Sequence, residues 1–165
     1  MWETPAELSA LQQLLDDSFA AASPHLVSIM SPARRLSAQQ VVEQLPSPAV
    51  LNIASVTARG EPRLSAVDGH FLHGHWYFTT AAGSPKARQL RARPATSAAY
   101  TPRDGMGVFC HGHAVELPPG EERQMVIDHF VETYGQSPEV WGDIYYARID
   151  ATWLVAFAMT PEDSP

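Results

Sequence analysis

Residues 76–90 read Trp76-Tyr77-Phe78-Thr79-Thr80-Ala81-Ala82-Gly83-Ser84-Pro85-Lys86-Ala87-Arg88-Gln89-Leu90, and they hold most of the information in the chain. They predict a β-strand ending in two threonines, a loop of small residues, and a helix that starts with a cation. Ser84 takes the N-cap position and Pro85 the first helical position, where its missing N–H costs nothing. Lys86 then lies in the first turn, where the helix dipole disfavours a cation unless an anion is bound. The stretch predicts either a phosphate site or an ordinary capped surface helix whose lysine points into water.

Composition indicates one globular domain over residues 1–165, because 45% of the residues are hydrophobic and the length suits a sizeable core. The net charge of −7 argues against nucleic acid as the main partner, since phosphate backbones bind basic surfaces. The single cysteine, Cys110, excludes an internal disulfide and fits a reducing cytosol. The acidic N-terminus lacks a signal-peptide pattern, and no apolar run approaches the roughly 20 residues that cross a bilayer. We therefore expect a cytoplasmic protein with no membrane partner.

Residues 1–48 predict a helical extension. Two capping boxes, Thr4–Glu7 and Ser37–Gln40, each start a helix, and the first helix is expected to end near Ser23-Pro24. Residues 24–36 follow no clear pattern and are expected to be irregular.

Residues 49–160 predict the main body of the fold. Strands are expected at residues 50–57, 63–72, 75–80, 95–100, 107–117 and 145–159. Helices are expected at residues 84–92 and 121–134, and a loop at residues 137–144. Short strands joined by hairpins, with helices only at the margins, favour a mainly β fold built on an antiparallel barrel.

Side chains near Lys86 suggest what a bound ligand would look like. If Lys86 holds a phosphate, the hydroxyls of Thr79 and Thr80 lie within reach of a ribityl or ribose chain. The strand at residues 63–72 offers a wall for a flat ring through Arg63, Ser65, Val67 and His70. Arg88 supplies a second cation. A phosphate, a polyol and a flat ring together describe FMN.

Four segments, in the right order, resemble the FMN-binding split barrel, the pyridoxamine 5′-phosphate oxidase-like superfamily. They are Leu51–Val56 with Gly60–Arg63, then Tyr77–Thr80 through Ser84, Lys86 and Leu90 to Arg93-Pro94, then Gly112–Glu116, and finally Arg148–Asp150. The likeness covers residues 37–160.

The resemblance implies a six-stranded antiparallel split barrel that forms a homodimer, with two cofactor sites at the dimer interface. It implies that Ser65, Ala66 and Val67 line the isoalloxazine ring, that Thr79 and Thr80 contact the ring edge or ribityl chain, and that Ser84 and Lys86 hold the phosphate. The implied function is an FMN-dependent oxidoreductase acting on a small molecule. The alternatives are a reductase using the 8-hydroxy-5-deazaflavin coenzyme and a non-enzymatic flavin- or haem-binding protein. The N-terminal helix from Thr4 lies outside the family pattern and is expected to cross the dimer or to cover the site.

Two departures from the family pattern argue against pyridoxamine 5′-phosphate as the substrate. Pro85 stands where these oxidases have an arginine before the lysine. The chain also ends in the acidic segment Pro161–Pro165 instead of a basic segment with a late tryptophan and arginine.

The histidines do not form a standard metal site. His111 and His113 share a strand face, and His73 and His75 flank a turn, but no cysteine or nearby carboxylate completes a zinc set. We therefore expect no metal. The sequence shows no paired carboxylates and no Ser/His/Asp order, so His70 is the one candidate proton donor and other catalytic residues stay unassigned. A redox cofactor carries its own chemistry and needs no such set.

Overall fold

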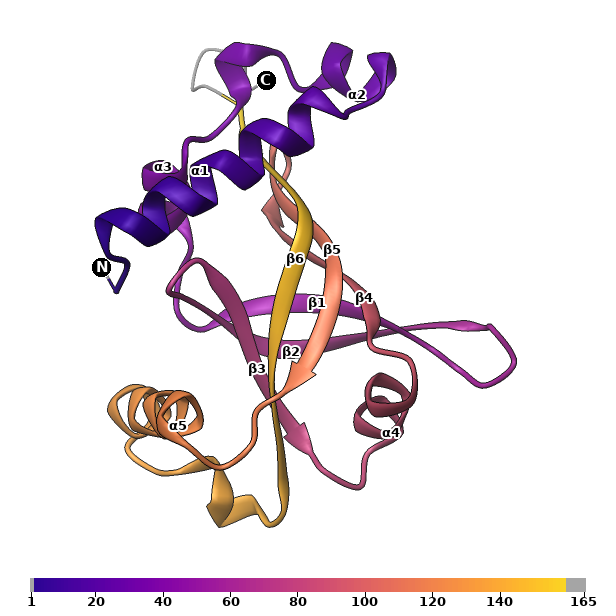
Figure 1. Ribbon diagram of the computed structural model, residues 1–165, viewed down its shortest axis with the longest axis vertical. Coiled ribbons are helices and arrows are strands. Elements are labelled where there is room, and N and C mark those ends of the chain that lie inside the picture. The colour runs from indigo at the N-terminus through magenta and orange to yellow at the C-terminus, as the bar shows by residue number, and fades with distance from the viewer. Residues whose placement is uncertain (1, 160–165) are drawn as a thin grey trace.

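A computed structural model of the chain describes residues 2–159 and shows a closed antiparallel barrel with helices around it (Figure 1). The strands follow the order β1-β2-β3-β6-β5-β4 around the barrel, and β4 pairs with β1 to close it. They are β1 (Ala49–Val56), β2 (Pro62–Leu72), β3 (His75–Ala81), β4 (Ala95–Arg103), β5 (Met106–Glu116) and β6 (Ile144–Ala158). This confirms the predicted mainly β fold with six strands.

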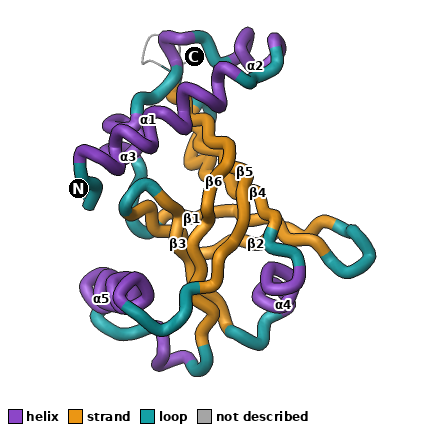
Figure 2. Tube along the Cα trace, in the orientation of Figure 1, coloured by secondary structure: helices purple, strands orange, loops and turns teal. Residues whose placement is uncertain are grey.

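The helices lie outside the barrel wall (Figure 2). They are α1 (Pro5–Ala20), α2 (Pro24–Ile29), α3 (Ala38–Gln44), α4 (Pro85–Ala92) and α5 (Glu121–Tyr134), with short 3₁₀ helices η1 (Pro32–Arg34) and η2 (Pro138–Trp141). Both predicted capping boxes are present: the Thr4 hydroxyl accepts from Glu7 N–H, and the Ser37 hydroxyl accepts from Gln40 N–H. The helical N-terminal extension is therefore confirmed.

Two segments expected to be irregular contain short helices. The prediction for residues 24–36 was wrong at α2, which Ser23 caps by accepting from Leu26 N–H, and at η1. The expected loop at residues 137–144 contains η2. None of the residues of α2 is buried, so the segment carries no apolar periodicity that would reveal a helix.

The barrel interior holds the main core. Its large side chains come from all parts of the wall and include Leu51, Ile53, Phe71, Trp76, Phe78, Tyr145, Ile149 and Leu154. Gly69 permits close packing, because a Cβ there would lie 2.6 Å from the Cβ of Leu51. A second cluster lies between α5 and the outer side of the barrel, where Val126 and Phe130 meet Leu72 and Tyr77.

Helix α1 closes the end of the barrel opposite to α4 (Figure 1). Leu11 and Leu15 enter the main core, and burial of each contributes about 1.5–3 kcal/mol. The Ser18 hydroxyl accepts a hydrogen bond of 2.8 Å from Leu154 N–H near the far end of β6. This helix does not cover the Lys86 end of the expected site, because α1 and α4 lie at opposite ends of the barrel (Figure 1), and the expectation that it crosses a dimer stays a prediction.

None of the helices among residues 2–159 is long and apolar enough to span a membrane. The acidic segment Pro161–Pro165, which bears on the substrate, lies outside the described residues.

Candidate functional site

Strands β2 and β3 pair over only part of their length. Their register runs from Leu72–His75 to Gly69–Phe78 and then stops. Beyond that point, residues 62–68 of β2 pair with β1, and residues 79–81 of β3 pair with β6. We call this opening between the two strands the fork. Backbone groups along the second edge of residues 62–68 have no strand partner in the described chain, so they are free to bond a flat ligand with donors and acceptors at its rim.

The three residues predicted to line a ring lie on this unpaired edge. Ser65, Ala66 and Val67 pair with Ile53, Asn52 and Leu51 of β1 on their other side. Val67 packs against the main core, whereas Ala66 is exposed. The structure therefore brings these three residues together at the fork.

Thr79 and Thr80 lie across the fork on β3. Successive strand residues point to opposite faces, so Thr80 shares the face of Phe78 in the barrel core and Thr79 shares the face of Tyr77 below α5. Both threonines are partly buried, and within residues 2–159 neither hydroxyl has a hydrogen-bond partner. Each hydroxyl is available to a ligand, but from different sides of the strand.

The start of α4 follows β3 after three residues and has the geometry that the sequence predicts. Ser84 has extended backbone angles, and its hydroxyl accepts a hydrogen bond of 3.1 Å from Ala87 N–H. Lys86 is the only lysine in the chain. Its ammonium has neither an ion pair nor a hydrogen bond to any residue in the described part, although the side chain is partly buried. This burial lowers the pKa of Lys86 because it disfavours the charged form.

Two arginines fix the loop between β3 and α4. Arg88 donates to the carbonyl oxygen of Gly83, and Arg91 donates to the carbonyl oxygen of Ala82 at 2.8 Å. The N–H of Ala82 donates in turn to the carbonyl oxygen of Asp143 at 2.8 Å. Arg88 therefore binds the loop that leads to the predicted anion site, and its contact with a phosphate stays a prediction.

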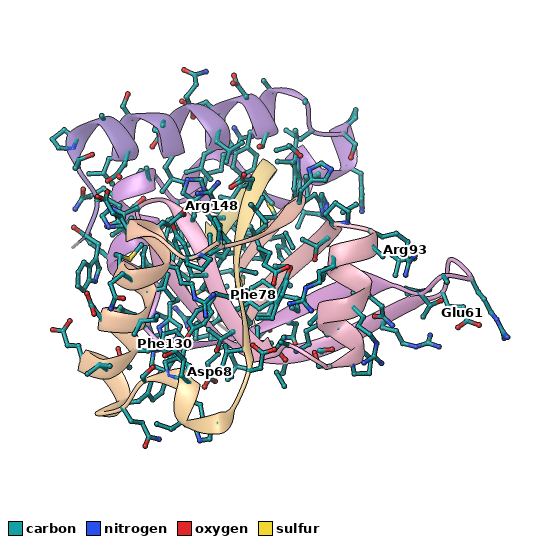
Figure 3. All side chains as sticks on the ribbon, turned by 60° about the horizontal axis from the view of Figure 1, so that its bottom comes forward. Glu61, Asp68, Phe78, Arg93, Phe130 and Arg148 are labelled. Atoms are coloured by element: carbon teal, nitrogen blue, oxygen red, sulfur yellow. The ribbon has the colours of Figure 1, made fainter. Side chains whose placement is uncertain are left out.

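Arg63 does not converge on Lys86 through any described contact. It is exposed and forms an ion pair of 2.7 Å with Glu61, and it also donates to the carbonyl oxygen of Pro62. Glu61 projects at the tip of the β1–β2 hairpin in Figure 3. Arg63 thus has partners within the hairpin, and its predicted contact with a cofactor stays a prediction.

His70 is fully buried between β2 and α5. Its Nδ1 lies 2.9 Å from Ser47 Oγ and 2.9 Å from His129 Nε2, and these last two atoms are 3.0 Å apart. Desolvation, together with the neighbouring His129, lowers the pKa of His70 to about 4. His70 is therefore neutral at pH 7. Because its side chain is fully buried, it has no direct contact with a ligand at the protein surface to which it could donate a proton.

Two residues that the sequence analysis missed connect this buried cluster to the fork. The Tyr134 hydroxyl lies 3.2 Å from His70 Nε2 and 3.3 Å from Asp68 Oδ2. Asp68 is exposed, and it is the residue immediately before β2–β3 pairing begins at Gly69. In Figure 3, Asp68 and Phe130 lie on the α5 side of the barrel, and Arg93 lies on the α4 side. The one available signal in the sequence is a lone carboxylate in a strand that is otherwise poor in charge.

A second surface on the barrel carries uncharged side chains, with the Asp68 carboxylate at its edge opposite Val50. We call it the open sheet face, and it comprises outward-facing residues of β1, β2, β4 and β5: Val50, Asn52, Ala54, Leu64, Ala66, Ser97, Ala99 and His111. Val50 is 64% exposed and Leu64 is 73% exposed. Two shallow hollows of about 400 and 420 Å³ lie along this face. Away from Asp68, it therefore offers an uncharged surface with small side chains to a partner.

Histidine, cysteine, aspartate and glutamate side chains do not gather into a metal-binding group of three within residues 2–159. His111 instead donates to or accepts from the Ser97 hydroxyl at 2.8 Å and stacks on Trp153, with ring centroids 4.6 Å apart.

Comparison with known families gives one match that spans most of the chain. The family model described as pyridoxamine 5′-phosphate oxidase matches residues 37–162. No curated protein matches the sequence.

Solved structures share the fold at low identity. A conserved hypothetical protein from Mycobacterium tuberculosis is 18% identical, with a TM-score of 0.67, and the match covers 81% of this chain and 92% of that chain. HutZ, the haem storage protein from Vibrio cholerae, is 18% identical, with a TM-score of 0.61 and coverage of 73% and 95%. An FAD-binding protein from Mesorhizobium loti is 20% identical, with a TM-score of 0.57 and coverage of 74% and 93%. These likenesses establish the fold and leave the ligand open.

Proposed function

The chain belongs to the pyridoxamine 5′-phosphate oxidase family, and from that premise we propose that it is an oxidoreductase that binds FMN in the fork. Bound FMN supplies the hydride or electron transfer to a small-molecule substrate. The protein then has to bind the phosphate, orient the ring and exclude water from one of its faces.

One observation carries this proposal: the only lysine is partly buried at the positive end of a helix with no anionic partner in the described chain. Such a cation is unfavourable unless an anion binds beside it. A phosphate next to Ser84 and Lys86 would accept hydrogen bonds from the hydroxyl, the ammonium and the Lys86 N–H, and would offset both the desolvation and the helix dipole.

The fork supplies what the rest of FMN requires. The unpaired edge at residues 65–67 presents backbone donors and acceptors to the rim of a ring. The free hydroxyls of Thr79 and Thr80 lie between that edge and the phosphate anchor, on opposite faces of β3, so one of the two can bond a ribityl chain that passes on its side of the strand. The donor set therefore fits FMN in order, from the phosphate at the α4 end of the fork to the ring along β2.

We further propose that two copies pair through the open sheet face. An exposed leucine and valine among small uncharged side chains form the kind of surface that a stable protein normally covers. A second copy of the same face supplies the same small uncharged residues, and a twofold axis closes the contact. The single cysteine is buried and free, which fits the reducing cytoplasm in which we place the protein.

The deciding experiment identifies the small molecule that copurifies with the protein, by absorbance and mass. FMN spectra and mass support the proposal. A bound deazaflavin coenzyme would move the assignment to a deazaflavin-dependent reductase, and a Soret band would move it to a haem-binding protein. If the protein is isolated without ligand, titration with FMN, the deazaflavin coenzyme and haemin makes the same distinction, and absence of FMN binding would overturn the proposal.

A further inference from the structure

Asp68 occupies the inner end of the fork, at the opposite end from Lys86. Strand β3 continues from Phe78 past Thr80 into the loop and α4, so the phosphate anchor lies at the open end of the fork. Asp68 lies on β2 at the last position before the two strands pair. A ligand that extends from Lys86 along β2 would therefore point its far end toward Asp68.

The Asp68 carboxylate has no cation to neutralise it. Among the described residues no lysine, arginine or histidine lies within ion-pair distance of it, and its one hydrogen bond comes from the Tyr134 hydroxyl. The other polar groups behind Tyr134 are His70, His129 and Ser47, all uncharged at neutral pH because burial lowers the pKa of both histidines. Within the described chain, no cation therefore offsets the Asp68 carboxylate at the fork.

A chain of buried hydrogen bonds holds this carboxylate in place. Tyr134 bridges Asp68 and His70, and His70 is fixed by Ser47 and His129 in a triangle of contacts between 2.9 and 3.0 Å. Neutral histidines satisfy this triangle only if one of the two facing nitrogens carries a proton and the other accepts. Tyr134 has one hydroxyl proton, which it donates to Asp68, so His70 donates from Nε2 to the Tyr134 oxygen and accepts at Nδ1 from within the triangle.

Asp68 lies where the cover that α5 provides over β2 ends. Helix α5 covers the outer side of β2 at His70 and Leu72, whereas Leu64 and Ala66 on the same side are bare. Asp68 lies at the boundary between the part that α5 covers and the open sheet face through which we propose that two copies pair, and a substrate that stacks on the ring would reach it at that boundary.

We propose that Asp68 is a specificity-determining carboxylate, positioned by Tyr134 and His70, which selects substrates that present a cation or an N–H donor and rejects substrates that present an anion. The assignment rests on the proposed binding of FMN in the fork. A negative charge at this point attracts an amidine or amine and repels a carboxylate or phosphate, and the low dielectric of a filled site strengthens both effects. It follows that a second phosphate group, on the substrate, is disfavoured at this end.

The test uses FMN-loaded protein and two flat probes of opposite charge, benzamidine and benzoate. Wild-type protein should bind benzamidine about tenfold or more tightly than benzoate. Asp68→Asn should abolish that preference, Asp68→Glu should retain it, and Tyr134→Phe should weaken it because the carboxylate is no longer held. Asp104→Asn, an exposed carboxylate in the β4–β5 turn, is the matched control and should leave the preference unchanged.

A second readout separates this role from a purely structural one. A nearby carboxylate disfavours added electrons on the flavin ring, so Asp68→Asn should raise the midpoint potential of bound FMN and Asp104→Asn should not. If the wild type binds FMN, but Asp68→Asn changes neither the ratio of benzamidine to benzoate affinity nor the midpoint potential, the role of Asp68 is overturned. The proposed binding of FMN would then still stand. Failure of the wild type to bind FMN overturns the proposed function, and this inference with it.

Discussion

Arg91 on α4 donates two parallel hydrogen bonds to Glu116 at the end of β5, from Nε to Oε2 at 2.8 Å and from Nη2 to Oε1 at 2.6 Å. The same guanidinium also holds the carbonyl oxygen of Ala82, so one side chain joins the helix, the barrel and the loop before the helix. The Ser55 hydroxyl also donates a hydrogen bond of 2.6 Å to Gln89 Oε1. Together, the contacts of Arg91 and Gln89 fix the orientation of α4 against the barrel.

We expect the Arg91–Glu116 pair to contribute little to stability, because both side chains are about 40% exposed. A double-mutant cycle with Arg91→Ala and Glu116→Ala should give a coupling free energy of about 0.5–1 kcal/mol in urea unfolding. A coupling above about 2 kcal/mol would contradict this reading and would indicate that the pair is effectively desolvated.

Lys86→Ala should weaken FMN binding by about 1.5–3 kcal/mol, a rise in Kd of roughly 10- to 150-fold, because a charged hydrogen bond to the phosphate is lost. Flavin fluorescence titration measures this directly. Arg103→Ala removes the same charge at the other end of β4 and serves as the control, with no change expected. Equal affinities in the wild type and Lys86→Ala would remove Lys86 from the site.

Stability should fall as the pH is lowered from about 6.5 toward 4. The folded state lowers the pKa of His70 from 6.5 to about 4, so its neutral form is favoured there, and the unfolded chain takes up a proton first. The stability contribution is complete above the unfolded pKa and is lost progressively below it, by up to about 3 kcal/mol at pH 4 from this one group. Urea unfolding at several pH values measures the slope.

Comparison of His70→Gln with His25→Gln assigns that slope. His25 is exposed on α2, so its replacement should leave the pH dependence unchanged, whereas His70→Gln should flatten it between pH 4 and 6.5. Equal slopes in the wild type and His70→Gln would show that the loss arises elsewhere.

Gly112→Ala should destabilise the barrel by about 3 kcal/mol, since a Cβ there would lie 2.1 Å from the carbonyl oxygen of Asp150, a backbone atom that cannot move aside. Gly83→Ala is the matched control, because a Cβ at Gly83 meets nothing within 4 Å and the residue has no positive φ. Thermal unfolding of both variants checks the contrast, which fails if the two melt alike.

Leu64→Arg should separate the proposed dimer into monomers of 18.1 kDa. Leu64 is 73% exposed in the single chain, so the change leaves the monomer fold intact while placing two like charges in the contact. Light scattering after size exclusion measures the mass. Val131→Arg on the exposed side of α5 is the control, and a dimer that survives Leu64→Arg would move the interface to another surface.

Local signals in the sequence predicted the elements well. The caps at Thr4, Ser37 and Ser84 are contacts between residues three positions apart, so a short stretch contains all the information. The family and the six-stranded barrel are likewise confirmed, because the motif order and strand spacing were visible along the chain.

The parts that the sequence did not reveal depend on distant pairings. The fork exists because the β2–β3 register stops at Gly69, and no local pattern marks where two strands separate. Tyr134 meets Asp68 across 66 residues, and Ser47 meets His129 across 82, so neither contact leaves a periodic signal. Helix α2 was missed for a different reason, since it is short and buries none of its residues.

The position of β6 in the barrel has a consequence for how the chain folds during synthesis. Strand β6 is the last strand among residues 2–159, yet it lies between β3 and β5. Until β6 has left the ribosome, β3 and β5 each present an unpaired edge, and the barrel cannot close around its core. Because the pairing of β3 with β6 spans about 70 residues, it closes late and slowly. The nascent chain is therefore most exposed to aggregation in the interval between the emergence of α5 and the arrival of β6.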